Sequence, residues 1–186
     1  IFDPSASALT VVPSRIKWRT AYYSNVDTLP GSLSHLPIAD IPWHFYTHVV
    51  QTALLPVNSN GVPSIDAGAY FIGDGPGSNA MAFTNAAHAN GSKALVSLLV
   101  GSKEALTMER NTTPQTIGTF VTVLSNYVIR NKYDGIDIDW EVHASRPAFA
   151  TQFPDLIRRL RISMPDKVIS IAATIADRGT YAATYP

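Results

Sequence analysis

Five short runs of apolar and β-branched residues recur along the chain, separated by longer stretches of mixed polarity. They cover residues 17–23, 45–55, 93–100, 133–141 and 167–175. The third and fifth runs are almost continuously apolar, which is typical of strands that are covered on both faces. Pro56 ends the second run and Gly101 ends the third. We therefore expect five β-strands at these positions.

Two stretches between these runs carry the periodicity of amphipathic helices. The first stripe consists of Ile117, Phe120, Val121, Leu124, Tyr127 and Val128. The second consists of Phe153, Leu156, Ile157 and Leu160. Thr113 can cap the first helix and Pro114 suits its first position. Pro154 either starts the second helix or kinks one that begins near Pro147. A third, alanine-rich helix is expected over residues 79–90.

The order of these elements indicates the fold class. Strands that alternate with helices predict βαβ units, a parallel sheet and right-handed crossovers. Five such strands fit either an open doubly wound sheet or part of a (β/α)8 barrel. Residues 58–78 are rich in Gly, Pro, Asn and Ser, so we expect a long loop there.

Composition and charge exclude several classes of function. The chain has 186 residues, which suggests one domain with a real core, and 46% of them are hydrophobic. The net charge is zero, which argues against nucleic acid as a partner. The absence of cysteine excludes a disulfide scaffold, a thiolate zinc site and a cysteine nucleophile. No apolar run approaches the roughly 20 residues of a membrane span. No signal segment opens the sequence, so a secreted chain would be in its mature form.

The fourth run carries the candidate chemistry, because it reads Asp134-Gly-Ile-Asp137-Ile-Asp139-Trp-Glu141. Side chains alternate between the faces of a strand, so Asp137, Asp139 and Glu141 share one face. The intervening positions are apolar: Ile136, Ile138 and Trp140. The apolar face would meet helices, and the acidic face would point into an interior or a cleft.

Three carboxyl groups on one face of a central strand repel one another. Burial disfavours ionisation further, so at least one of the three is expected to keep its proton at a raised pKa. A carboxyl group that is protonated near neutral pH is what general acid catalysis requires. A solvated edge strand and a hard-cation site are the alternatives. The segment lacks the Asp-rich loop and turn glycine of an EF-hand, and we expect no metal.

This segment resembles the Asp-x-x-Asp-x-Asp-x-Glu signature of family-18 glycoside hydrolases, the chitinases and their relatives. All four acids are present, and Gly135 occupies the usual position between them. In that family the motif lies on the fourth strand of a (β/α)8 barrel, and here it falls on the fourth run. The resemblance therefore implies a TIM barrel of which this chain contains about five β/α units.

Other strands are similar to the family more loosely. Tyr22 lies where the family's first strand carries a tyrosine that contacts the acidic cluster. Thr47-His48-Val49 and Ser170-Ile171-Ala172 resemble the second and fifth strands. Ser97 matches the serine of the family's Ser-x-Gly-Gly motif, but this chain continues Leu98-Leu99-Val100, without the two glycines.

The resemblance implies a retaining, substrate-assisted mechanism. Glu141 would act as general acid and base, while the substrate's own N-acetyl oxygen attacks the anomeric carbon. Asp139 would orient the acetamido group, and Asp137 would share a proton with Asp139, held by Tyr22 and Ser97. Asp134 lies at a different spacing, so we expect it to order the start of the strand.

The implied function is a chitinase-type hydrolase that cleaves β-1,4-linked N-acetylglucosamine without a cofactor. The alternatives are a chitinase-like lectin that binds chitin oligosaccharides and an endo-β-N-acetylglucosaminidase that acts on N-glycans. The expected partners are chitin or its oligosaccharides, with neither nucleic acid nor a membrane, and the expected location is extracellular. A (β/α)8 barrel takes about 250 residues, so we expect residues 1–186 to be the N-terminal part of one catalytic domain whose remainder follows Pro186. We expect this piece alone to be inactive.

Three further features complete the sequence-based expectations. Asn90-Gly-Ser92 and Asn111-Thr-Thr113 are glycosylation sequons in expected loops, relevant if the protein is secreted. His44 and His48 lie four residues apart but have no third ligand at zinc-site spacing, so we expect both to be packing residues.

Overall fold

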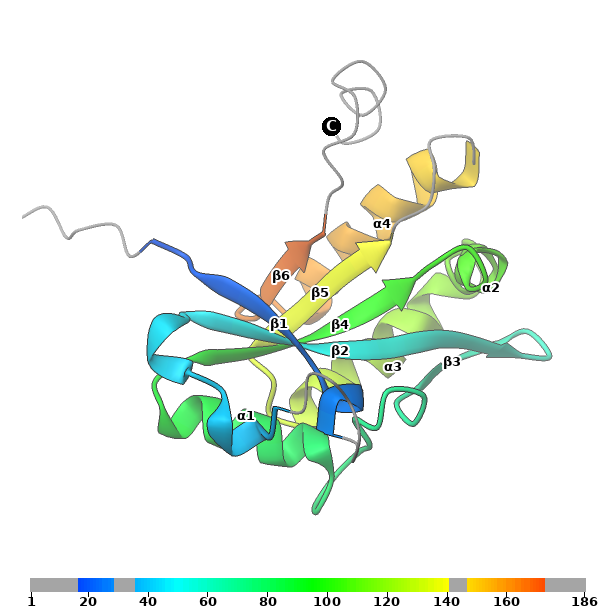
Figure 1. The fold of residues 1–186 in the computed structure, drawn as a ribbon. Coiled ribbons are helices and arrows are strands. Elements are labelled where there is room, and N and C mark those ends of the chain that lie inside the picture. The colour runs from blue at the N-terminus through cyan, green and yellow to red at the C-terminus, as the bar shows by residue number, and fades with distance from the viewer. Residues whose placement is uncertain (1–16, 29–35, 141–146, 173–186) are drawn as a thin grey trace, which may run out of the picture.

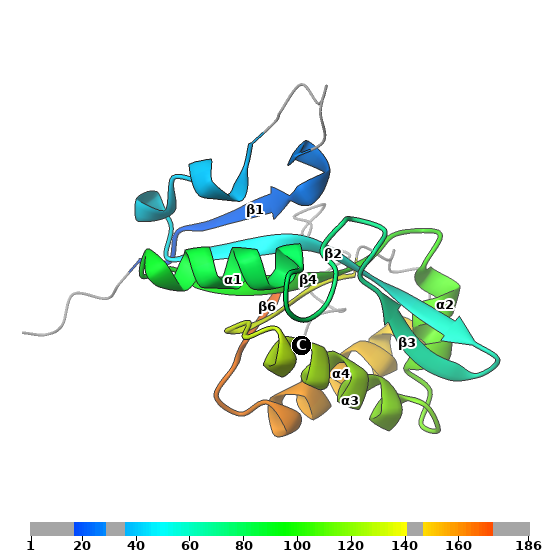
Figure 2. The same cartoon turned by 90° about the horizontal axis from the view of Figure 1, so that it is seen from below.

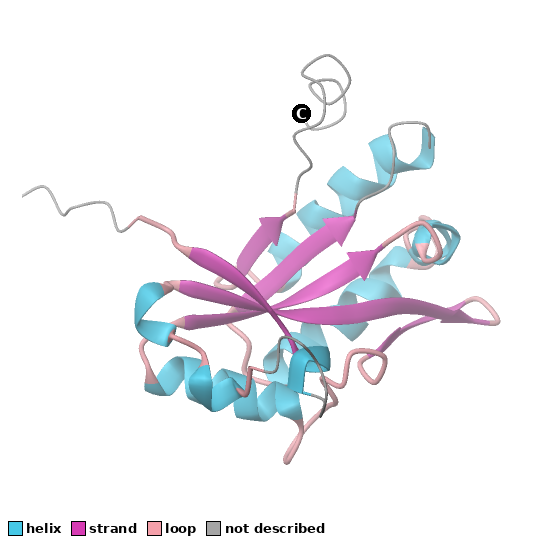
Figure 3. Cartoon of the chain, in the orientation of Figure 1, coloured by secondary structure: helices cyan, strands magenta, loops and turns pink. Residues whose placement is uncertain are grey.

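The structure, a computed structural model, describes residues 17–28, 36–140 and 147–172. The strands are β1 (Thr20–Ser24), β2 (His48–Ser59), β3 (Val62–Asp66), β4 (Lys93–Val100), β5 (Gly135–Trp140) and β6 (Val168–Ile171). The helices are α1 (Asn79–Ala89), α2 (Ala105–Asn111), α3 (Ile117–Arg130) and α4 (Pro147–Ser163). Short 3-10 helices span Asn25–Thr28, Ile38–Asp40 and Trp43–Phe45. Figures 1 and 3 show these elements in one orientation.

The strands form a curved sheet in the order β1-β2-β4-β5-β6, with β3 attached to β2. The five strands on this path are parallel, whereas β3 runs antiparallel to β2. Helices α1, α3 and α4 lie on the same side of the sheet (Figure 2). The arrangement is a half-barrel, so the expected parallel βαβ architecture is confirmed.

The side of the sheet that faces the helices forms the core. On β5 the core side chains are Ile136, Ile138 and Trp140, all 2% exposed or less, as the alternation along this strand predicts. Trp140 meets the ring of Phe149 edge-on, with the ring centroids 5.1 Å apart. This packing against α4 commits the acidic positions of β5 to the opposite, inner face.

The helices begin close to their expected positions, with one exception at α3. That helix starts at Ile117 instead of near Pro114. The Thr113 and Thr116 hydroxyl groups lie 2.7 Å apart and stabilise a turn that precedes the helix. Helix α4 begins at Pro147 with Pro154 inside it, which decides between the two expected starts. Helix α2 was not predicted.

The hairpin of β2 and β3 corrects two expectations. Pro56 does not end the second strand, and residues 58–78 are not one long loop, because β2 continues to Ser59 and β3 follows directly. The pairing of β2 with β4 ends at Leu54, so Pro56 pairs with β3 alone, where a strand tolerates its missing N–H. Asn60 and Gly61 turn the chain with φ of 53° and 84°. An Asn-Gly dipeptide is the strongest short-range signal for a hairpin, so Asn60-Gly61 is the sequence feature that predicts this turn.

Candidate active site

Asp137 is the centre of a hydrogen-bonded cluster on the inner face of the sheet. It is 1% exposed. Its Oδ2 accepts hydrogen bonds from the Tyr22 hydroxyl at 3.1 Å and the Ser97 hydroxyl at 3.3 Å. Its Oδ1 accepts a shorter hydrogen bond, 2.6 Å, from the Ser170 hydroxyl. Both oxygens of a buried carboxyl group are therefore satisfied by neutral hydroxyl donors.

Strand register explains how these residues meet. Ser97 on β4 and Ser170 on β6 are the direct neighbours of Asp137 on the two sides of β5. Tyr22 belongs to the row of Gly135, two residues earlier along the strands. Its long side chain reaches Asp137 from β1, across the width of the sheet. Four of the five parallel strands thus contribute to one cluster.

The Tyr22 hydroxyl is held in its protonated, donating form. Partial burial raises its pKa, and the nearby negative charge of Asp137 raises the pKa further. Deprotonation would place a second anion beside the buried carboxyl group. Tyr22 therefore acts as a hydrogen-bond donor to Asp137 over the whole neutral range.

Asp139 lies on the same inner face, one position before the last residue of β5, at the carboxyl end of the strand. Active sites of (β/α) barrels are built at this end. The neighbour of Asp139 on β4 is Leu99, so an apolar side chain shares its face at a position where the family motif has glycine. Glu141, the expected general acid, lies outside the described residues.

Asp134 fastens the start of β5. Its Oδ2 accepts a hydrogen bond of 2.9 Å from the backbone N–H of Ala94 and lies 2.8 Å from His88 Nε2 of α1. The backbone N–H of Asp134 in turn donates to the Ala94 carbonyl at 2.7 Å. This first acid of the motif therefore joins three elements, and it makes these contacts away from the inner face, as its spacing predicts.

Gly135 is required because β6 approaches it closely. A Cβ atom at this position would lie 2.1 Å from the backbone oxygen of Val168. Only glycine allows Val168 and Ser170 to pair with β5 in this register. The glycine between the first two acids of the motif thus enables the contact between Ser170 and Asp137.

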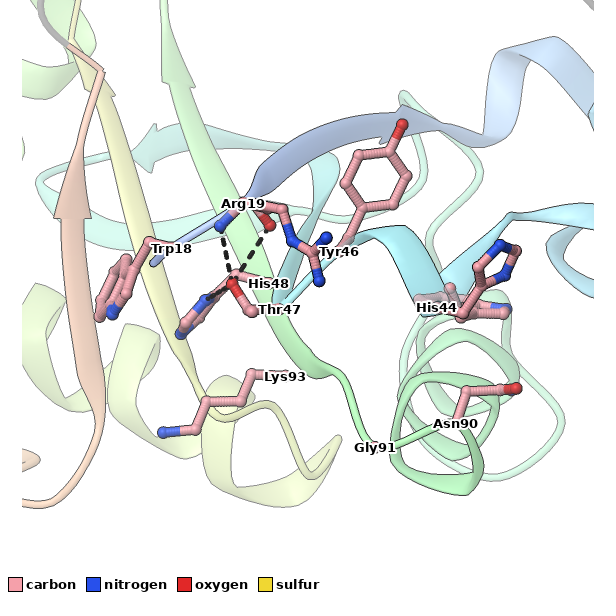
Figure 4. A pocket seen from close by; sticks show the side chains of 10 residues that line it. Trp18, Arg19, His44, Tyr46, Thr47, His48, Asn90, Gly91 and Lys93 are labelled. Atoms are coloured by element: carbon pink, nitrogen blue, oxygen red, sulfur yellow. Dashed lines mark hydrogen bonds between the residues drawn. The ribbon is translucent and has the colours of Figure 1, made fainter. Parts of the chain in front are cut away.

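Two hollows lie beside the strands, at different positions along them. A pocket of about 220 Å³ on the inner face is lined by Trp18, Thr20, Tyr22, His48, Leu95, Asp137, Ser170 and Ile171. A second hollow of about 430 Å³ lies at the amino ends of β2 and β4 and is shown in Figure 4. It is lined by Trp18, Arg19, Trp43, His44, Tyr46, Thr47, His48, Asn90, Gly91 and Lys93. The inner-face pocket contains Asp137, whereas the second hollow lies at the opposite strand ends from Asp139.

The remaining expectations concern metal and membrane. Within residues 17–28, 36–140 and 147–172, no three His, Asp or Glu side chains gather in a way that could hold a metal ion. In the same part of the chain, no helix combines the length and apolarity needed to cross a bilayer. His48 stacks on Trp18 with ring centroids 4.0 Å apart, which is a packing role.

The structure brings together Asp137, Tyr22 and Ser97, which the sequence had singled out, but their part in a reaction stays a prediction. Ser170 was quoted only as part of the fifth strand and was given no role. The sequence signal for Ser170 was that it is a polar residue within the fifth apolar run. The alternation of side chains along a strand places it on the inner face. Without the register of β6 against β5, this signal could not be assigned to Asp137.

A parallel half-barrel with a carboxylate cluster on its inner face defines a (β/α)-barrel protein of the kind that builds its site at the carboxyl ends of its strands. The sequence matches glycosyl hydrolases family 18 over residues 19–186. The chain therefore belongs to this family. A comparison with curated proteins gave no match.

Solved structures support the same fold. A Group IV chitinase of Ostrinia furnacalis has a TM-score of 0.69 and 20% identity, and the match covers 90% of this chain and 46% of that one. A chitinase of Pseudoalteromonas aurantia has a TM-score of 0.66 and 22% identity, covering 90% and 61%. A chitinase-like agglutinin of Robinia pseudoacacia has a TM-score of 0.62 and 22% identity, covering 82% and 45%. The chain thus spans about half the length of most of these relatives.

Proposed function

We propose that this chain supplies the acidic half of a chitinase active site, which hydrolyses β-1,4-linked N-acetylglucosamine polymers with retention of configuration. The observation that carries the proposal is the buried Asp137 with its three hydroxyl donors, beneath Asp139 at the carboxyl end of β5. Stability alone does not explain this buried acid, because an apolar residue at the same position would pack without a desolvation penalty. The whole activity belongs to the complete barrel.

In the proposed reaction, the residues act in sequence. Glu141 protonates the leaving glycosidic oxygen, and the acetamido oxygen of the substrate attacks the anomeric carbon. Asp139 accepts a hydrogen bond from the acetamido N–H and stabilises the positive charge that develops. Asp137 lies below Asp139 and exchanges a proton with it, while Tyr22 and the two serines fix its position. Water activated by Glu141 then releases the product.

Chitin oligosaccharides are the proposed substrates. The family and the chitinases of similar fold support this class, and the Ostrinia furnacalis chitinase has been solved with allosamidin. Allosamidin is therefore the first ligand to test. Secretion is proposed on the same family grounds.

The decisive variant is Glu141→Gln in the full polypeptide that carries this sequence. We expect release of product from N-acetylglucosamine tetramers to fall by at least about a hundredfold, since general acid catalysis contributes about 10²–10⁴. The melting temperature should be unchanged. Glu104→Gln at the start of α2 makes the same chemical change elsewhere and should leave turnover intact. Unchanged turnover in the Glu141 variant would contradict the proposed role of Glu141 as general acid and base.

A second candidate is a chitin-binding lectin without activity. Leu99 beside Asp139 favours it, because a leucine in place of glycine fills space on the inner face where a sugar would lie. The similar fold of the Robinia pseudoacacia agglutinin supports the same possibility. Calorimetric binding of the tetramer without release of product would select the lectin. Cleavage of a high-mannose glycopeptide, but not of the tetramer, would select an endo-β-N-acetylglucosaminidase.

A further inference from the structure

The two glycosylation sequons of the chain lie in contrasting environments. One is Asn90-Gly-Ser92, between α1 and β4, and the other is Asn111-Thr-Thr113, at the end of α2. An N-linked glycan requires an asparagine whose side-chain amide can point into solvent in the folded protein. The two positions can therefore be compared directly.

Asn111 is fully buried, contrary to the expectation that its sequon lies in a loop. Its Nδ2 donates to the Val57 carbonyl at 3.0 Å, and its Oδ1 accepts from Asn58 Nδ2 at 2.8 Å. Both polar atoms of the amide are thus used to attach the β2–β3 hairpin to α2. A glycan on Asn111 would replace one hydrogen of this buried amide with a sugar for which the packed site has no room, so the hairpin could not stay attached to the helix in this way.

Asn90 lies on the surface, where α1 ends. It is exposed, and its Nδ2 makes one local hydrogen bond, to the Ala86 carbonyl one turn earlier at 2.8 Å. Gly91 continues with φ of 72°, and a Cβ atom placed there would meet no atom within 4 Å. The backbone at Gly91 therefore has open space beside it, and freeing the Asn90 amide costs one exposed hydrogen bond.

The position of Asn90 also separates it from the proposed active site. β4 begins three residues later, so Asn90 lies at the amino ends of the strands, at the rim of the hollow in Figure 4. Asp139 lies at the carboxyl end of β5. A glycan on Asn90 would extend from the opposite end of the half-barrel and leave the approach to Asp139 free.

We propose that Asn90 is the attachment site of an N-linked oligosaccharide and that Asn111 stays unmodified in the folded protein. The co-reactant is a lipid-linked oligosaccharide pyrophosphate, used by the transferase of the secretory pathway. The Asn90 amide nitrogen forms a bond to the anomeric carbon of the donor sugar, and the bond from that carbon to the pyrophosphate oxygen breaks. The lipid pyrophosphate leaves with the electron pair, and the amide loses one proton.

Ser92 sets the order of events. Its buried hydroxyl donates to the carbonyls of Tyr46 at 2.9 Å and Trp43 at 3.2 Å. The transferase must read this hydroxyl, so Asn90 is modified before Ser92 reaches these two carbonyls. The folded structure accommodates a glycan on Asn90. A chain that received a glycan on Asn111 at the same stage could not bury that amide against the hairpin, so we expect such chains to be absent from the folded, secreted protein.

The test uses the full polypeptide, secreted by cultured insect cells behind a cleavable signal and carrying an Asn-Gly-Thr tag at its C terminus as a positive control. Peptide mass spectrometry after enzymatic deglycosylation in heavy-oxygen water reports occupancy at each asparagine, in both the medium and the lumenal pool. We expect a glycan on Asn90 and on the tag. Asn90→Gln should remove one glycan.

Thr113→Val destroys the second sequon without changing the Asn111 side chain, so it is the matched control and should leave the glycan count of the secreted protein unchanged. An unoccupied Asn90 beside an occupied tag would overturn the proposal. A glycan on Asn111 in the folded protein, isolated as the fraction that resists a brief trypsin treatment, would also overturn it. Neither outcome depends on hydrolase activity, so this test is independent of the proposed function.

Discussion

Asp137 is a buried carboxyl group that is surrounded by hydroxyl groups instead of a cation. In the part of the chain that the structure describes, the side chains of Tyr22, Ser97 and Ser170 donate hydrogen bonds to it. Hydroxyl donors satisfy its oxygens without neutralising its charge. The three hydroxyl groups therefore hold the position of Asp137 through hydrogen bonds from neutral donors.

Ser170 is expected to be needed for activity, if the proposed function holds. Ser170→Ala removes the donor at 2.6 Å and leaves Oδ1 of Asp137 without that hydroxyl. Losing a hydrogen bond to a buried charged group costs about 1.5–3 kcal/mol. We expect kcat/KM for an N-acetylglucosamine tetramer to fall by about tenfold or more, with a shift in the pH profile of kcat, measured on the full polypeptide.

Two variants separate this role from general destabilisation. Ser170→Thr keeps the hydroxyl and should restore most of the activity. Ser64→Ala on β3 removes a serine away from the cluster and should change neither kcat/KM nor the pH profile. An unaltered pH profile and rate in Ser170→Ala would show that this hydroxyl does not position Asp137.

At the scale of elements, local sequence signals predicted most strands and helices but not all of their boundaries. The apolar runs predicted the five parallel strands, the two amphipathic stripes predicted α3 and α4, and the alanine-rich segment predicted α1. The hairpin was not predicted because a proline usually ends a strand, whereas Pro56 pairs with β3 alone and β2 continues to the Asn-Gly turn. The start of α3 was misplaced because the Thr113 hydroxyl pairs with Thr116 instead of capping the helix.

The hairpin turn offers a matched pair of glycine substitutions. A Cβ atom at Gly61 or at Gly118 would meet no atom within 4 Å, so neither change introduces a clash. Gly61 has φ of 84°, where alanine is strained, and Gly61→Ala should lower the free energy of unfolding by about 1 kcal/mol. Gly118 is the second residue of α3, where the backbone is already helical, and Gly118→Ala should raise the free energy of unfolding by about 0.5 kcal/mol.

Urea denaturation of both variants measures these changes. Opposite signs are the expected result, because steric space is equal and only the backbone conformation differs. A stabilising Gly61→Ala would contradict the left-handed turn and with it the observed hairpin geometry.

At the scale of the whole molecule, the fold class and the centre of the candidate site could be predicted from the sequence. The Asp-x-x-Asp-x-Asp-x-Glu segment indicated the family. The alternation of acidic and apolar residues along β5 predicted which side chains lie on each face of the strand. Contacts between distant strands could not be predicted, because they depend on register. Asp137 with Ser170 and Asn111 with the hairpin are examples, and both required the structure.

The whole molecule should lose stability in alkali. Burial raises the pKa of Tyr127, Tyr133 and Tyr22. Asp74 raises the pKa of Tyr127 further, whereas Arg130 lowers it, and the net direction is upward. Above pH 10 the unfolded chain loses these protons while the folded protein keeps them, so the free energy of unfolding falls as pH rises. The two buried groups, Tyr127 and Tyr133, each contribute at most about 1.4 kcal/mol per pH unit. The half-exposed Tyr22 contributes less, because solvent screens its charge.

Urea midpoints between pH 8 and 12 measure this loss. We expect a plateau up to about pH 10 and a fall beyond it, with a shallower slope in Tyr127→Phe, which removes one of the three groups. A flat profile to pH 12 would mean that the tyrosines ionise equally in both states.

The cluster around Asp137 has a consequence for how the chain finds its native topology. Its donors come from β1, β4 and β6, at sequence separations of 115, 40 and 33 residues. A slip of one residue in β6 would turn Ser170 to the opposite face and leave a desolvated carboxyl group short of a donor. The residues proposed for catalysis thus also destabilise sheets in which β6 is out of register. The same hydrogen bonds that shape the site therefore favour the native strand register during folding.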